Sequence, residues 1–175
     1  MKCGKIWYMN WVKSMRKLRI ANGQGMVEFA LVLPILLLVM LGIIEFGRLL
    51  FTYSMISAAS REGARYAAAA GRVPSTGTQR HSDCAGIIAA ATRIGAFAGV
   101  GAGDVTISYD EGPGTAAYSS VCPPSQYVNL KDRVIVTVST SFQPVVPIMN
   151  VPTIPFSMTT RRTIIKDVQM ITPTP

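Results

Sequence analysis

The stretch Gly23-Gln-Gly-Met-Val-Glu-Phe-Ala-Leu-Val-Leu-Pro34 opens a long apolar run and decides how the chain is organised. From Phe29 to Ile44 the run contains no charged residue. A helix needs roughly 20 residues to cross a hydrocarbon core of about 30 Å, so the run must continue past Glu45. The sequence therefore predicts a single transmembrane helix over residues 24–52.

The positive charge of the chain is concentrated before this run. Six lysines and arginines and no acid precede Gly23, whereas the rest of the chain has 11 basic and 9 acidic residues. A basic block next to an apolar span is typical of the cytoplasmic side of a membrane, and this interpretation is favoured over nucleic-acid binding. We expect residues 1–23 to be a cytoplasmic leader, the span to contact membrane lipid, and the C-terminal region to be extracytoplasmic.

A cleaved secretory signal peptide is the alternative, with a cut near Ala59. It fits poorly, because the region before the apolar run is too long and because Glu28, Glu45 and Arg48 interrupt the run.

Helical periodicity continues after the span. Residues 53–71 are predicted to extend the same helix, with a buried face made of Ile56, Ala59, Ser60, Gly63, Ala67 and Ala70. Gly71 is expected to end this helix because glycine tolerates a left-handed backbone. Ser82 or Asp83 can cap a second helix over 84–99.

Strand patterns follow the second helix. Residues 105–109 and 133–142 alternate as strands do, a turn and a loop through Cys122 lie between them, and a last strand is plausible at 156–165. Four prolines from Pro144 to Pro155 indicate an irregular or edge-like passage. The predicted fold class is α+β: a long N-terminal transmembrane-plus-extramembrane helix, and an extracytoplasmic domain over 72–175 with a second helix and a small, mainly antiparallel sheet.

The cysteines fit the predicted topology. Outside the cytosol, Cys84 and Cys122 can form a disulfide between the second helix and the loop before the main strand. This interpretation is favoured over two separate buried thiols, and it would stabilise the fold by roughly 3 to 4 kcal/mol. Cys3 lies in the leader and is expected to stay reduced.

Catalytic and metal-binding chemistry have little support in the sequence. The single histidine, His81, adjoins Ser82 and Asp83, but neighbours in sequence seldom converge as a triad, and a solvated loop histidine is expected. Cys84 and Cys122 lack the close-spaced partners of a zinc site. We expect no cofactor, no metal and no small-molecule substrate.

The arginines of the C-terminal region raise a separate question. A set of them could form a basic patch, but Glu62, Asp132 and Asp167 are interspersed, so a solvated face is expected. The set is Arg61, Arg65, Arg72, Arg161 and Arg162.

Charged residues also border the predicted span. Glu45 and Arg48 are three residues apart and can pair on one helix face, or each can meet an opposite charge on a neighbouring helix. Glu28 is costly near hydrocarbon unless it has a partner.

The motif now has a recognisable form, in which Gly23 is followed by four residues and then by Glu28-Phe29 and an apolar helix. It resembles the processing site of type IV prepilins, and more closely that of pseudopilins in the tight adherence (Tad, or Flp-type) pilus system. With the continuation Ser57-Ala-Ala-Ser-Arg-Glu-Gly-Ala-Arg-Tyr-Ala-Ala68, it is similar to the TadE-like family over roughly residues 20–70.

The resemblance implies that a prepilin peptidase cuts between Gly23 and Gln24. It implies further partners, namely other pilins or pseudopilins and the inner-membrane assembly platform, and a minor pilin that primes, joins or caps a pilus without being an enzyme. In a bundle of cut chains, Glu28 can pair with the new terminal amine of a neighbour. A silent Glu28 near the headgroup layer is the alternative for that residue. A membrane-anchored binding or adhesion domain that never joins a filament is the alternative for the whole chain.

Overall fold

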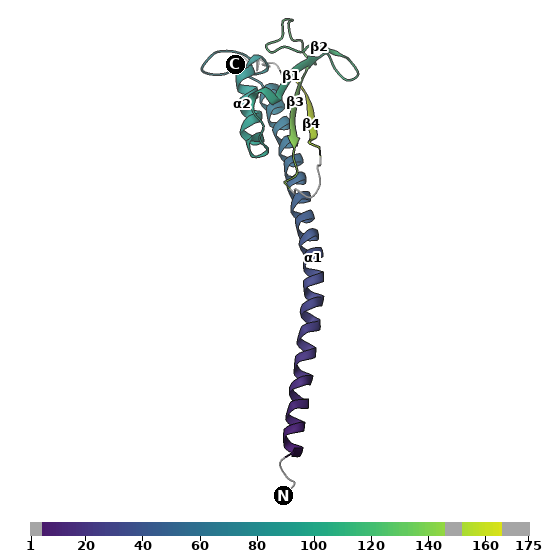
Figure 1. The fold of residues 1–175 in the computed structure, drawn as a ribbon. Coiled ribbons are helices and arrows are strands. Elements are labelled where there is room, and N and C mark those ends of the chain that lie inside the picture. The colour runs from purple at the N-terminus through teal and green to yellow at the C-terminus, as the bar shows by residue number, and fades with distance from the viewer. Residues whose placement is uncertain (1–4, 146–151, 166–175) are drawn as a thin grey trace, which may run out of the picture. The chain divides into compact units, whose positions relative to one another are not determined.

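The computed structural model describes residues 5–145 and 152–165, with side chains from Gly23 onward. Two compact units divide the chain, Met1–Phe46 and Gly47–Pro175. Helix α1 (Lys5–Ala68) contains residues of both units and begins within the predicted leader, upstream of the expected start at Gln24 (Figure 1). The second unit thus includes the last six residues, 47–52, of the predicted span.

The described part of the first unit is a helix with an apolar surface. Its large hydrophobic side chains are exposed, from 37% at Leu33 to 74% at Met26. Gly23–Ala68 contains an 18-residue window of mean hydropathy 2.8 of which nothing is buried. Pro34 lies inside this helix. Such a surface needs lipid or other helices around it, and the segment is long and apolar enough to cross a membrane.

In the second unit, the last turns of α1 carry the predicted buried face. Ile56, Ala59, Ser60 and Ala67 are all 1% exposed or less. The helix ends at Ala68, two residues earlier than expected, so Ala70 lies outside it and is exposed. Gly71 has a φ of 97°, the left-handed backbone predicted for it.

The second helix, α2 (Cys84–Gly95), is capped by Asp83, whose carboxylate accepts a hydrogen bond from the Gly86 amide at 3.1 Å. The expected cap is confirmed. The helix tightens into a 3-10 turn, η2 (Ala96–Ala98), before a left-handed Gly99. Two further 3-10 turns, η1 (Arg80–Ser82) and η3 (Ala102–Asp104), flank this region.

Four described strands form one antiparallel sheet in the order β2-β1-β3-β4. Strand β1 (Val105–Asp110) and strand β3 (Arg133–Phe142) agree with the predicted strands, whereas β2 (Ala117–Ser119) was expected to be loop. Strand β4 (Ile154–Thr163) begins two residues earlier than predicted and includes Pro155. Proline is tolerated there because β4 is an edge strand.

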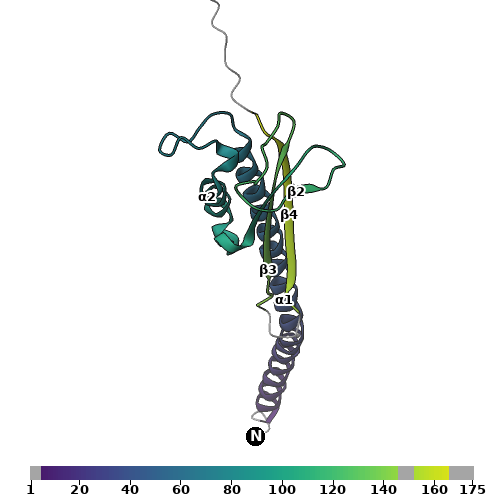
Figure 2. The ribbon, with the colours of Figure 1, turned by 90° about the horizontal axis from the view of Figure 1, so that it is seen from above.

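The two helices of this unit cover one face of the sheet (Figure 2). Alternate residues of β1 and β3 point at them and are 8% exposed or less: Val105, Ile107, Tyr109, Val134, Val136 and Val138. Gly63 of α1 lies where both helices meet β3, since a Cβ there would stand 3.1 Å from Val136 Cγ1 and 3.2 Å from Ala91 Cβ. The α+β fold class is confirmed.

The opposite face of the sheet carries hydroxyl groups. Because paired residues of antiparallel strands share a face, the register assigns to this side Asp110, Arg133, Ile135 and Arg161. It also assigns to it eight serines and threonines, namely Thr106, Ser108, Thr137, Ser139, Ser141, Ser157, Thr159 and Thr163. The hydroxyls of Thr137 and Thr159 lie 2.9 Å apart across the strands. This face therefore stabilises the sheet by polar cross-strand pairs.

Candidate functional site

The predicted processing segment lies on the exposed surface of α1. Gly23, Gln24, Glu28 and Phe29 are all exposed, and Phe29 is 63% exposed. The Gln24 side-chain amide donates to Glu28 Oε1 at 3.4 Å, as residues four apart on a helix can. A Cβ at Gly23 would meet nothing within 4 Å. In this chain, Gly23 and the side chain of Glu28 thus both lie on the exposed surface of the helix.

Arg48 lies in the second unit, at the beginning of its part of α1. The Arg48 guanidinium stands 5.4 Å from the centroid of the Phe142 ring, at the end of β3, in cation–π geometry. A shallow hollow of about 530 Å³ adjoins this contact and is also lined by Phe51 and Phe97, of which Phe97 is 78% exposed. Arg48 therefore contributes to packing within its own unit. Glu45 lies in the first unit and is half-buried.

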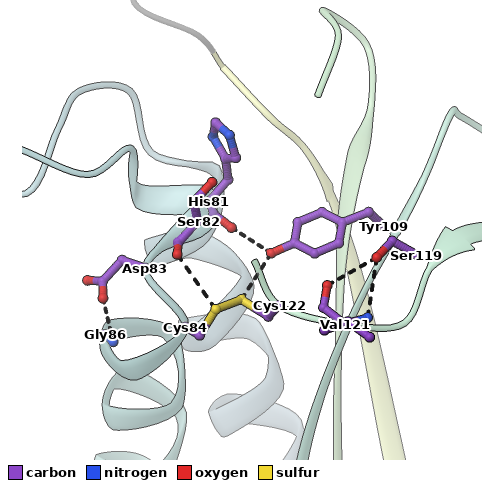
Figure 3. Close-up of a disulfide and its surroundings, with 9 residues drawn as sticks. All are labelled: His81, Ser82, Asp83, Cys84, Gly86, Tyr109, Ser119, Val121 and Cys122. Carbon is purple, nitrogen blue, oxygen red and sulfur yellow. Dashed lines mark hydrogen bonds between the residues drawn. A yellow bond between two sulfur atoms is a disulfide. The ribbon is translucent and has the colours of Figure 1, made fainter. Parts of the chain in front are cut away.

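A disulfide joins Cys84, the first residue of α2, to Cys122 in the loop after β2 (Figure 3). The two Cα atoms are 5.7 Å apart. The fully buried Tyr109 of β1 donates its hydroxyl to the carbonyl oxygen of His81 at 2.6 Å, and the same hydroxyl lies 3.3 Å from Cys122 Sγ. Burial raises the pKa of Tyr109 well above its usual range. One tyrosine thus connects the sheet, the turn before α2 and the disulfide.

The expectation of a solvated His81 is wrong. His81 lies in η1 and is 7% exposed, because the Tyr109 contact draws this turn onto the sheet. Its neighbour Asp83 caps α2 and also accepts a hydrogen bond from the Tyr66 hydroxyl at 2.6 Å. That bond, and then burial, raises the pKa of Tyr66. The carboxylate of Asp83 and the carbonyl of His81 therefore serve structural contacts.

A buried ion pair was missed by sequence reasoning. Arg133 of β3 donates to both carboxylate oxygens of Asp110 at 2.7 and 2.6 Å, and also to the Gly112 carbonyl at 2.8 Å. This bidentate bond raises the pKa of Arg133. Asp110 is 1% exposed, and Arg161 Nε of β4 lies 3.9 Å from it. The sequence has opposite charges at the end of β1 and the start of β3, but their pairing can be inferred only once the register of the two strands is known.

A second carboxylate, Asp132, is also buried and accepts hydrogen bonds from the Asn129 amide at 2.7 Å and the Tyr118 hydroxyl at 3.2 Å. Burial, followed by the charge of Asp132, raises the pKa of Tyr118 to about 12. Within residues 5–145 and 152–165, no three His, Cys, Asp or Glu side chains gather as metal ligands would. The buried charges of this unit are therefore matched locally.

The apolar helix, its entry motif and the small residues that pack α1 in the second unit all fall within one stretch of sequence. Residues 23–65 match the model of the TadE-like protein family. The resemblance found in the sequence is thereby confirmed for this segment, which associates the chain with the Tad pilus machinery. Comparison with curated proteins and with solved structures gives no match.

Proposed function

We propose that this chain is a minor pilin or pseudopilin of a Tad-type pilus assembly machine, cut after Gly23 by a prepilin peptidase. The observation that carries the proposal is the spacing of Gly23, Glu28 and Phe29 at the start of the segment that matches the TadE-like model. The helix that follows exposes its apolar side chains, as a segment that packs against other membrane helices must. Incorporated in this way, the chain primes, joins or caps the pilus.

Glu28 is the proposed assembly residue. Cutting before Gln24 creates an α-amino group that is charged near neutral pH. In hydrocarbon, pairing of a carboxylate with an ammonium lowers the free energy of burying both charges. Glu28 of one cut chain can therefore bind the terminal amine of the next chain and fix the axial register between them. Glu28 is exposed, as contact with a neighbouring chain requires.

Cleavage is tested by mass spectrometry of the protein recovered from cells with and without the peptidase. We expect a chain that starts at Gln24 only when the peptidase is present, and a full-length chain when Gly23 is replaced by valine. A terminus at Met1 in both cells, or one near Ala59, contradicts the proposal.

Assembly is tested separately with Glu28→Ala. This variant should be cut and inserted normally but should be absent from sheared pili. Glu62→Ala is the matched control, because it removes a half-buried carboxylate from the same helix outside the motif. Equal incorporation of both variants would show that Glu28 has no assembly role.

We further propose that the N-terminus is cytoplasmic, that the second unit is extracytoplasmic and that the chain has no catalytic activity of its own. The basic leader and the Cys84–Cys122 disulfide support the orientation. The structural roles of Asp83 and of the His81 carbonyl support the absence of catalysis, since Asp83 already accepts two hydrogen bonds. In cells without the peptidase, where the leader is retained, labelling of Cys3 by a thiol reagent only after the inner membrane is permeabilised would agree with this orientation.

A further inference from the structure

A groove runs between the last turns of α1 and the end of β4. It has a volume of about 800 Å³, and four arginines line it: Arg61, Arg65, Arg161 and Arg162. The sequence predicted a solvated face at these positions because acids are interspersed with them. All four are exposed, in agreement with that expectation, and the structure in addition brings them to one groove.

The neighbouring acids are directed elsewhere. Glu62 binds Arg65 at 2.7 Å and Arg93 at 3.4 Å, and both contacts lower its pKa. Asp132 is buried among its own hydrogen-bond donors. Asp167 lies outside the described residues. Among the residues that the structure describes, no carboxylate lines the groove.

Two of the arginines form no ion pair with a described carboxylate. Arg61 and Arg162 are exposed, and within the described part of the chain neither has a carboxylate within 4.0 Å. The unit that begins at Gly47 has 11 basic and 7 acidic residues in total, so the groove adds to a field that already attracts anions.

The groove also reaches the backbone edge of the sheet. Strand β4 is the last strand in the order β2-β1-β3-β4, so its outer edge is unpaired within the described sheet. Thr160 and Arg162 point toward α1, whereas Arg161 and Thr163 point to the opposite face. All four consecutive residues line the groove, so it lies against the end of this edge strand, where alternate N–H and C=O groups are free to bond.

We propose that this groove binds an acidic, extended segment of a partner protein, which pairs with β4 as a fifth strand. Its backbone bonds to the outer edge of β4, and the carboxylates on the side of the segment that faces α1 contact Arg61 and Arg162. A peptide fits better than an anionic lipid or free phosphate because it alone uses both the strand edge and the guanidinium groups. Arginine suits this role because its planar fork binds carboxylates in a bidentate manner.

The test uses the full chain in a neutral detergent and a fluorescein-labelled octapeptide of alternating glutamate and threonine. Three matched peptides accompany it: one with glutamine for glutamate, and two with the same residues that are N-methylated at alternate positions, one in each register. We expect the acidic peptide to bind, with an affinity that falls as salt is raised. The glutamine peptide, and the N-methylated peptide whose methyl groups replace the N–H groups that face β4, should bind at least about tenfold more weakly.

Protein variants locate the site. Arg61→Gln combined with Arg162→Gln should weaken binding about tenfold or more, which corresponds to the loss of at least 1.4 kcal/mol. Arg93→Gln is the control, since Arg93 is also exposed, lies on α2 and does not line the groove. All of these side chains are on the surface, so the variants should fold normally.

Several results would overturn the proposal. Equal binding of the N-methylated peptides would show a basic patch without strand pairing, and equal binding by the double variant would place the site elsewhere. Displacement of the peptide by phosphatidylglycerol vesicles, but not by neutral vesicles, would assign the groove to a membrane surface. The test needs no cleavage at Gly23, so its result is independent of the proposed pilin role.

Discussion

Removing the Cys84–Cys122 disulfide should destabilise the second unit more than any single surface change. The bond joins residues separated by 38 positions and therefore closes the loop that contains α2, β1 and β2. In the chain-entropy model, opening a loop of this length gives the unfolded chain freedom worth about 4 kcal/mol at 25 °C. Serine at both positions adds little further cost, because both side chains are half-buried and can reach water.

Thermal unfolding of the full chain in detergent measures this effect. For a unit of this size, 1 kcal/mol corresponds to a shift of about 3 to 5 °C in Tm, so the double serine variant should melt about 10 to 20 °C lower. Near-UV circular dichroism of the tyrosines is the suitable signal, because both tryptophans, Trp7 and Trp11, lie in the leader. Dithiothreitol should lower the Tm of the unmodified chain by a similar amount.

Cys3→Ser is the control for this experiment, since Cys3 lies outside the disulfide. Its Tm should equal that of the unmodified chain. A loss of less than about 1 kcal/mol in the double serine variant would refute the reasoning, because the loop would then already be restrained in the unfolded chain.

Two further predictions concern packing and pH. Gly63→Val should lower the free energy of unfolding by about 1 to 3 kcal/mol or more, because the valine methyl groups would enter space already occupied by Val136 and Ala91. Gly47→Ala is the control, since a Cβ at Gly47 meets nothing within 4 Å. Denaturant titration measures the free energy of unfolding of both variants. Tyr118 should make the fold less stable in alkali, because its pKa is raised to about 12 in the folded chain. The contribution of Tyr118 to the free energy of unfolding is therefore fully present below the ordinary pKa of 10.0, falls between pH 10 and 12, and is lost above that range. Urea midpoints at pH 9, 10 and 11 should fall less steeply for Tyr118→Phe; the raised pKa of Tyr109 leaves a residual slope, and identical slopes would contradict the assignment.

The regular elements of the second unit were largely predictable from local sequence. Residues 133–142 have valines at the alternate positions 134, 136 and 138, and the structure has β3 at those positions. The small residues from Ile56 to Ala67 repeat at helical spacing, and they form the buried face of α1. Strand β2 was not predictable, because three residues of a Ser- and Ala-rich loop carry no period and are ordered by pairing with β1.

Contacts between distant residues were the part that local patterns could not supply. Asp110 and Arg133 become partners only through the register of β1 and β3, which no single segment encodes. The burial of His81 depends on a tyrosine 28 residues away. Arg48 was assigned to the span by hydropathy, yet its side chain lies against Phe142, which is 94 positions further along the chain. The basic groove likewise needs α1 and β4 side by side.

The direction of β4 relative to α1 determines how the second unit carries a mechanical load. Ser60 contacts Thr160 at 2.9 Å, and the Ile165 amide donates to the Ala68 carbonyl at 3.3 Å, so the strand and the helix run the same way. Tension between Gly47 and Ile165 therefore pulls β4 along its own axis. The ladder between β3 and β4, with ten paired residues on each strand, resists this pull in shear, because all of its hydrogen bonds are strained together. A load applied across the sheet would instead unzip the same bonds one at a time.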